Sequence, residues 1–118
     1  MKFDLEERTE KFALDVRAFV KELPQTISNA EDSKQLIRAS GSVAANYIEA
    51  NEALSKKDFF YRIKVCRKES KVCRLFLRLM ESGGNERLEV ERSGLEKEAT
   101  EFILIFNKIL KSDDSSNF

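Results

Sequence analysis

The segment from Gln35 to Leu79 constrains the fold most strongly, because it holds two helical patterns separated by a very short turn. Apolar and small side chains recur at three- and four-residue spacing on both sides of this turn. A capping box, Ser55-x-x-Asp58, fits the start of the second helix. Because so few residues join the two helices, we expect them to fold back on each other as antiparallel neighbours.

Two more helical patterns flank this pair. Pro24 ends the first helix, Asn29 has the residue type of an N-cap for the second, and Gly83 and Gly84 supply a left-handed cap after the third. The predicted helices span about 4–23, 31–53, 56–81 and 86–111, and the tail 112–118 has the composition of a frayed end. With no competing strand pattern, residues 1–118 are predicted to form one all-α domain, an up-down-up-down antiparallel four-helix bundle.

The chain of 118 residues contains no His. Ser-His-Asp and Cys-His catalysis and the Glu-x-x-His ligands of di-iron bundles are therefore missing, and no Gly-rich phosphate loop is present. Cys66 and Cys73 lie two helical turns apart, roughly 10 Å, which is beyond disulfide reach. We expect buried thiols, no catalytic residues, no metal and no cofactor. The chain start lacks a signal-peptide pattern and no apolar run could span a bilayer, so a cytoplasmic protein without a membrane contact is expected.

The third predicted helix carries more apolar surface than one core requires. Its core stripe consists of Phe59, Ile63, Cys66, Ser70, Cys73 and Leu77. A second stripe lies roughly 120° further around the helix and consists of Val65, Val72, Leu75, Phe76 and Leu79. Exposed apolar patches mark interfaces, so this stripe predicts a homo-oligomer. The alternative is a very wide core face that both neighbouring helices cover.

Charge is unevenly distributed along the chain. The net charge is zero, but residues 34–80 carry eleven Lys and Arg against four acids, a net charge of +7. A basic stripe on the third helix consists of Lys57, Lys64, Arg67, Lys68, Lys71, Arg74 and Arg78. It has two interpretations: contacts to the phosphates of RNA or DNA, or pairing with the acidic fourth helix of a neighbouring copy. The zero net charge and the lack of interleaved aromatic residues weaken the first.

Four polar residues cluster on one side of the second helix, within about 40° around its axis. They are Arg38, Ser42, Asn46 and Glu49. One interpretation is a small-ligand or partner site. The other, which we favour, is a hydrogen-bonded network between helices or subunits, with Arg38 and Glu49 in electrostatic register, because such networks specify packing.

Three motifs in the second and third helices resemble those of a known family. The first reads Gln35-Leu36-x-Arg38-Ala39-x-x-Ser42-Val43-x-x-Asn46-x-x-Glu49, the second Lys57-Asp58-Phe59, and the third combines Lys68-Glu69 with Leu75-Phe76-Leu77-x-Leu79. Together they resemble the four-helix-bundle proteins encoded in 23S rRNA intervening sequences. The chain departs from that pattern at Ala50, usually Gly, at Val72, often an acid, and at Phe76, often Trp.

The resemblance implies a four-helix bundle that assembles into a ring, typically a pentamer, with no established enzymatic activity. The chain is similar also to the basic accessory bundle proteins of diversity-generating retroelements, which associate with nucleic acid. We therefore expect a non-enzymatic oligomeric interaction or scaffold protein whose partner is itself. The alternative is a nucleic-acid-binding accessory protein that uses the basic stripe.

Overall fold

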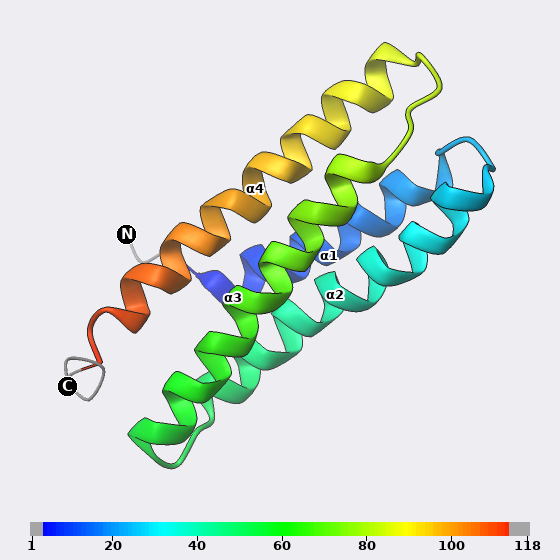
Figure 1. Cartoon of the computed structure of the whole chain (residues 1–118). Helices are drawn as coiled ribbons and strands as arrows, with labels where there is room; N and C mark the ends of the chain where they lie inside the picture. Colours follow the sequence, from blue (N-terminus) through cyan, green and yellow to red (C-terminus); the bar gives the residue numbers. More distant parts are fainter. Residues whose placement is uncertain (1–3, 114–118) are drawn as a thin grey trace.

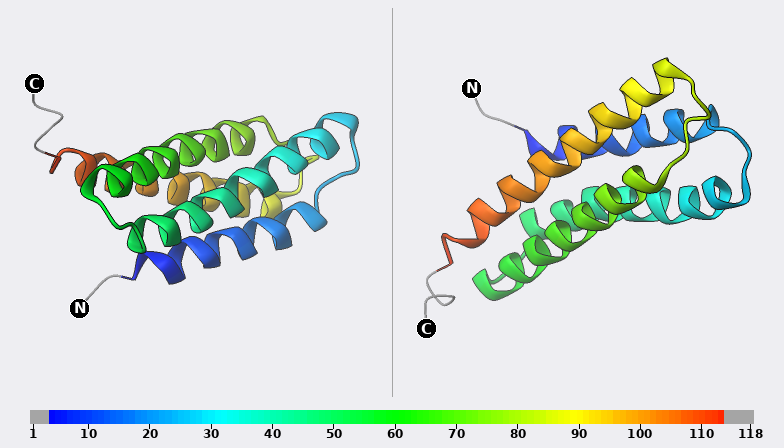
Figure 2. Two further views of the ribbon diagram at one scale, coloured as in Figure 1. Left: turned by 90° about the horizontal axis from the view of Figure 1, so that it is seen from below. Right: turned by 45° about the horizontal axis from the view of Figure 1, so that its top comes forward.

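A computed structural model describes residues 4–113 and shows four long helices packed side by side (Figure 1). They are α1 (Leu5–Lys21), α2 (Ile27–Asn51), α3 (Lys56–Leu79) and α4 (Glu86–Leu110), and no strand occurs in the described range. Each helix packs on the next along the chain, and α4 returns to α1. Successive helices run in opposite directions (Figures 1 and 2). The predicted all-α, up-down-up-down bundle is therefore confirmed at the level of the single chain.

Side-chain caps fix where the helices begin. The Ser55 side chain accepts a hydrogen bond from the backbone N–H of Asp58 at 3.0 Å, so the predicted N-cap of α3 is confirmed. In α2, by contrast, the N-cap is Thr26, whose hydroxyl accepts from the Asn29 N–H at 3.0 Å. The prediction of Asn29 as N-cap was wrong, and α2 begins at Ile27, earlier than residue 31.

Asn29 instead joins the two loops at one end of the bundle. Its buried amide donates to the carbonyl oxygens of Pro24 at 3.0 Å and of Glu81 at 2.9 Å, and it accepts from the Glu81 N–H at 3.0 Å. We call this set of three hydrogen bonds the Asn29 clasp. It links the α1–α2 loop to the α3–α4 loop, which lie together at one end of the bundle (Figure 1).

The C-terminal ends of α3 and α4 differ from the predicted ones. After Leu79, the backbone of Met80 is already extended, so α3 is not capped by a glycine. Positive φ angles occur later in the loop, 66° at Gly83 and 78° at Gly84. At the other chain end, the backbone N–H groups of Ser112 and Asp113 still bond to carbonyls of α4. These two residues are therefore not frayed, and the rest of the predicted frayed tail lies outside the described residues.

Aromatic side chains fill the centre of the bundle. Phe12 and Phe102 meet edge to face with ring centroids 5.3 Å apart, and Phe19 and Phe106 are also fully buried. The predicted core stripe of α3 is buried from Ile63 onward. Its buried residues are Ile63, Cys66, Ser70, Cys73 and Leu77. In the first turn of α3, however, Phe60 is the buried residue and Phe59 is half-buried.

The two cysteines are fully buried free thiols, as predicted. Burial raises the pKa of the Cys66 thiol to about 12 and that of Cys73 to about 12. Because the thiolate is the reactive form of cysteine, both thiols are unreactive at neutral pH. Within the part of the chain that the structure describes, no helix is both long and apolar enough to cross a membrane.

Candidate interaction surface

The polar residues predicted on the second helix lie along the edge of α2 that faces α3. The Arg38 guanidinium donates to both carboxylate oxygens of Glu69, at 3.1 and 3.3 Å. The Glu69 side chain is 7% exposed, whereas that of Arg38 is 53% exposed. These hydrogen bonds to Glu69 raise the pKa of Arg38. The buried carboxylate of Glu69 on α3 is thus ion-paired with Arg38, a surface residue of α2.

A second set of hydrogen bonds joins the same two helices further along. The Asn46 amide donates to the Ser42 carbonyl at 2.9 Å and to the Ser42 hydroxyl at 3.0 Å. Its carbonyl oxygen accepts from the Arg62 guanidinium at 3.0 Å. Arg38, Ser42 and Asn46 are therefore all engaged within the bundle. Glu49 is exposed, and the predicted register between Arg38 and Glu49 was wrong, because Glu69 on α3 takes the place of Glu49.

The second apolar stripe of α3 runs beside these polar groups on the outside of the bundle. We call it the α3 ridge; its residues are Val65, Val72, Leu75, Phe76 and Leu79. Leu75 is 50% exposed and Leu79 is 49% exposed. The other three are half-buried, and Val72 and Phe76 pack against the core. The core covers one edge of the ridge, as the wide-core alternative describes, and leaves the other edge open. Self-association through the open edge stays a prediction.

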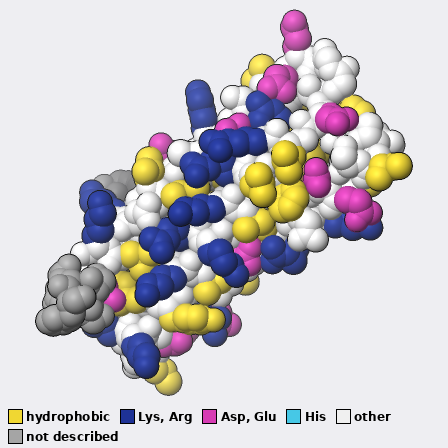
Figure 3. All heavy atoms as spheres, in the orientation of Figure 1, with side chains coloured by type: hydrophobic (Ala, Val, Ile, Leu, Met, Phe, Trp, Pro, Cys, Tyr) yellow, Lys and Arg dark blue, Asp and Glu magenta, His cyan; other side chains and the backbone are white. Residues whose placement is uncertain are grey.

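The basic stripe of α3 lies directly beside the ridge, on the side of the helix toward α4, where Arg67 and Arg78 make contacts. Figure 3 shows Lys and Arg side chains in a row along this face, with hydrophobic side chains beside them. Of the predicted residues, Lys57, Lys64, Lys68 and Lys71 are exposed, as is Arg78, whereas Arg67 and Arg74 are half-buried.

Two of these basic residues are engaged by α4 of the same chain. Arg67 donates to the Asn107 side chain at 2.9 Å, and Arg78 pairs with Glu96 at 2.7 Å. At Arg78 the pairing of the basic α3 with the acidic α4 occurs inside one chain, whereas the predicted pairing between neighbouring copies stays a prediction. The lysines of the stripe are exposed on the surface.

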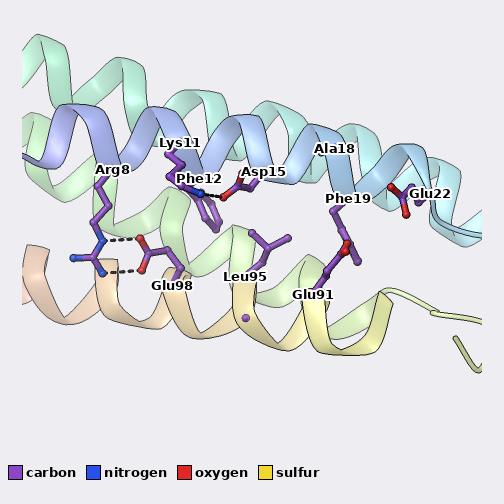
Figure 4. A pocket seen from close by; sticks show the side chains of 11 residues that line it. Arg8, Lys11, Phe12, Asp15, Ala18, Phe19, Glu22, Glu91, Leu95 and Glu98 are labelled. Carbon is purple, nitrogen blue, oxygen red and sulfur yellow. Dashed lines mark hydrogen bonds and ion pairs between the residues drawn. The ribbon is translucent and has the colours of Figure 1, made fainter. Parts of the chain in front are cut away.

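A groove between α1 and α4 was not anticipated from the sequence (Figure 4). It has a volume of about 520 Å³, and its apolar lining includes the side chains of Phe12, Phe19 and Leu95. Arg8 and Glu98 bridge it at one end with two hydrogen bonds of 2.6 and 2.7 Å. Lys11 pairs with Asp15 along its α1 edge at 2.7 Å, and Glu22, Glu91, Ala18 and Gly94 complete its lining.

A sequence signal for the groove did exist. Gly94 interrupts the helical pattern of α4 near its middle, at a position where a glycine lowers helix stability. A glycine in a helix interior often has a packing reason, and here Gly94 lies in the groove. Elsewhere, the described residues contain no group of three or more His, Cys, Asp and Glu side chains that could hold a metal ion.

Comparison with solved structures supports the fold assignment. The chain is similar to a protein of unknown function from the S23 ribosomal protein family of Bacteroides thetaiotaomicron, with a TM-score of 0.76 and 22% sequence identity. The alignment covers 92% of this chain and 99% of the other. No protein-family model and no curated protein matches the sequence. At this identity the likeness establishes a shared four-helix fold, and the S23 family is close to the intervening-sequence family that the motifs of α2 and α3 resemble.

Proposed function

We propose that this protein is a non-enzymatic interaction protein that acts by assembling with copies of itself through the outer face of α3. The observation that carries the proposal is the α3 ridge, where Leu75 and Leu79 are each half exposed beside Val72 and Phe76. Rows of large apolar side chains on a soluble surface are a usual mark of protein interfaces.

The polar network beside the ridge supports the same proposal. Arg38 and Glu69 fix α2 against α3 at the ridge's edge, so the surface offered to a partner is rigid, and little ordering entropy opposes its association. The motif resemblance of α2 and α3 favours a closed ring, typically a pentamer. Neither feature requires a reaction, a metal or a cofactor.

Light scattering of the purified protein at micromolar concentration tests this proposal. Leu75→Glu places a charge on the exposed edge of the ridge and should dissociate the assembly while helicity by circular dichroism is kept. Leu14→Glu is the matched control, because Leu14 is 59% exposed on α1 and lies outside the ridge. It should assemble like the wild type. A wild-type protein that is monomeric at this concentration would refute the proposal outright.

A second function, binding of RNA or DNA, is favoured by the exposed lysines of α3. Lys57, Lys64, Lys68 and Lys71 are exposed along one helix. Phosphate contacts of this kind would be independent of base sequence and steeply salt-dependent.

Gel retardation at low salt separates this second function from the first. Lys64→Glu with Lys71→Glu should weaken binding equally across sequences and give a shallower salt slope. Lys97→Glu with Lys108→Glu, two exposed lysines of α4, is the control with the same change in net charge. No retardation of RNA or DNA by the wild type would eliminate nucleic-acid binding. If the α3 variant binds normally but changes its assembly, the lysines act between subunits instead.

A further inference from the structure

The groove between α1 and α4 has the form of an acceptor for a helix. It runs between two helices and is lined by the apolar side chains of Phe12, Phe19 and Leu95, of which the two phenylalanines are 2% exposed and Leu95 is half-buried (Figure 4). Amphipathic helices bind in hydrophobic grooves of this type by laying apolar side chains at three- and four-residue spacing along the floor.

Gly94 gives the groove a second property, access to the backbone of α4. A Cβ atom built on Gly94 would meet no other heavy atom within 4 Å. Packing within the chain therefore gives no reason for a glycine in this helix interior, where glycine is disfavoured. A partner helix seated in the groove would give one, because the missing side chain allows close approach. Across the groove, α1 presents the small side chain of Ala18 (Figure 4).

Charge identifies α3 of a second copy as the occupant. The groove is lined by four carboxylates, those of Asp15, Glu22, Glu91 and Glu98, and by the two cations Arg8 and Lys11. Lys11 and Arg8 pair with Asp15 and Glu98, and Arg87 beside the groove pairs with both Glu22 and Glu91, which leaves four carboxylates against three cations. The α3 sequence carries nine Lys and Arg and two acidic residues, a net charge of +7. A basic helix with an apolar ridge matches an apolar groove whose lining has an excess of acid.

The same charges disfavour the simplest alternative, a symmetric contact between two α3 ridges. Lys64, Lys68 and Lys71 flank the ridge on the surface, and a two-fold contact would bring two such helices together with like charges opposed. Juxtaposed like charges act against a partner. In the groove, four carboxylates and only two cations line the surface that would meet this helix, so the repulsion is weaker there.

We infer that the α3 ridge of one copy packs into the α1–α4 groove of the next, with Leu75 and Leu79 on the groove floor and Gly94 admitting the incoming helix. This assignment rests on the proposed self-association and names the two surfaces that make it. Since ridge and groove are different surfaces, the contact is heterologous, and each copy uses one surface for each neighbour. Repetition of such a contact gives a ring if it closes and a filament if it does not.

Two complementary variants test the assignment. Gly94→Gln fills the groove with a side chain that suits a helix, and Leu75→Glu disables the ridge. Each alone should weaken assembly by about thirtyfold or more, the size of an interface hot-spot loss. An equimolar mixture should form a dimer and nothing larger, because one intact ridge and one intact groove remain in the pair. Analytical ultracentrifugation resolves the two cases.

Controls keep the outcomes distinct. Ala30→Gln adds similar bulk at an exposed site on α2 outside the groove and should assemble like the wild type. Ala18→Gln blocks the groove from α1 and should reproduce Gly94→Gln if that variant folds poorly. If both groove variants assemble normally, or if the mixture stays monomeric, the groove assignment is wrong while self-association stands. A monomeric wild type would instead overturn the proposed function itself.

Discussion

Two opposite sides of this bundle are built in contrasting ways. Between α2 and α3 the interface is closed: Arg38 neutralises the buried Glu69, and the Cys66 thiol lies 3.6 Å from the Val43 carbonyl oxygen, to which it donates. Between α1 and α4, the bridging pair Arg8–Glu98 sits at the rim with side chains 28% and 29% exposed, and a groove remains open beside it. The contrast indicates that buried polar groups fix α2 against α3, whereas the α1–α4 side keeps a surface unfilled by its own chain.

The largest effect should come from a charge placed in the closed interface. Cys66→Asp buries a carboxylate where the native side chain is 0% exposed, and should lower the free energy of unfolding by about 3–5 kcal/mol. Ala18→Asp, at an exposed site in the groove, should change it by less than about 0.5 kcal/mol. Urea titrations of both variants are carried out in the Leu75→Glu background, so that a change in oligomeric state does not contribute to the difference in stability. Equal losses would show that the two sides are packed alike.

High pH should act on the closed side next. Both thiols have pKa values raised from 9.0 to about 12 in the folded protein. Their contribution to stability is complete below pH 9 and is lost as pH rises toward 12, because the unfolded chain releases these protons first. By pH 10 the loss should be about 2–3 kcal/mol. Urea midpoints from pH 8 to 10.5 measure it, and the Cys66→Ala, Cys73→Ala double variant should show a much flatter profile. An identical slope in that variant would contradict the assignment to the thiols.

One interhelical ion pair on each side allows a direct comparison of the two sides. Arg38→Ala leaves Glu69, which is 5% exposed, without its two hydrogen bonds, and should cost about 1–2 kcal/mol. Arg8→Ala removes a pair whose side chains are both more than a quarter exposed, at a cost of less than about 1 kcal/mol. Adding Glu69→Gln to Arg38→Ala should recover part of the loss. If the Arg8 variant is the less stable of the two, the ion pair between α1 and α4 contributes more stability than the one between α2 and α3, contrary to the prediction.

The smallest effect should be a gain. Gly94→Ala replaces a helix-interior glycine where a Cβ has open space, so the single chain should become about 0.5–1 kcal/mol more stable. Gly41→Ala, whose Cβ would lie 3.5 Å from the Arg17 guanidinium, is the matched comparison inside a packed helix pair. Thermal melts in the Leu75→Glu background measure both. A loss at Gly94 would mean that the monomer itself needs the glycine.

The packing of α2 against α3 could largely be predicted from the sequence, and the groove between α1 and α4 could not. Helical spacing and the short turn at Ser55 place α2 against α3, because local periodicity and loop length act through neighbouring residues. Spacing along one helix does not reveal the partner across an interface, which is why Glu49 was paired with Arg38 in place of Glu69. Likewise, the α1–α4 groove depends on the distance in space between two helices that are at least 64 residues apart in the sequence. The sequence of neither helix determines this distance.

The Asn29 clasp has a consequence for how the molecule opens. At one end it ties the hairpin of α1 and α2 to the hairpin of α3 and α4, so local opening should start from the other end, where α1 begins and α4 finishes. Glu81 is an exposed loop residue, yet its backbone N–H donates a hydrogen bond to the side-chain Oδ1 of Asn29. The backbone amide of Glu81 should therefore exchange its hydrogen more slowly than the amides in the last turn of α4. Protection against exchange in the bundle should decrease with distance from the clasp.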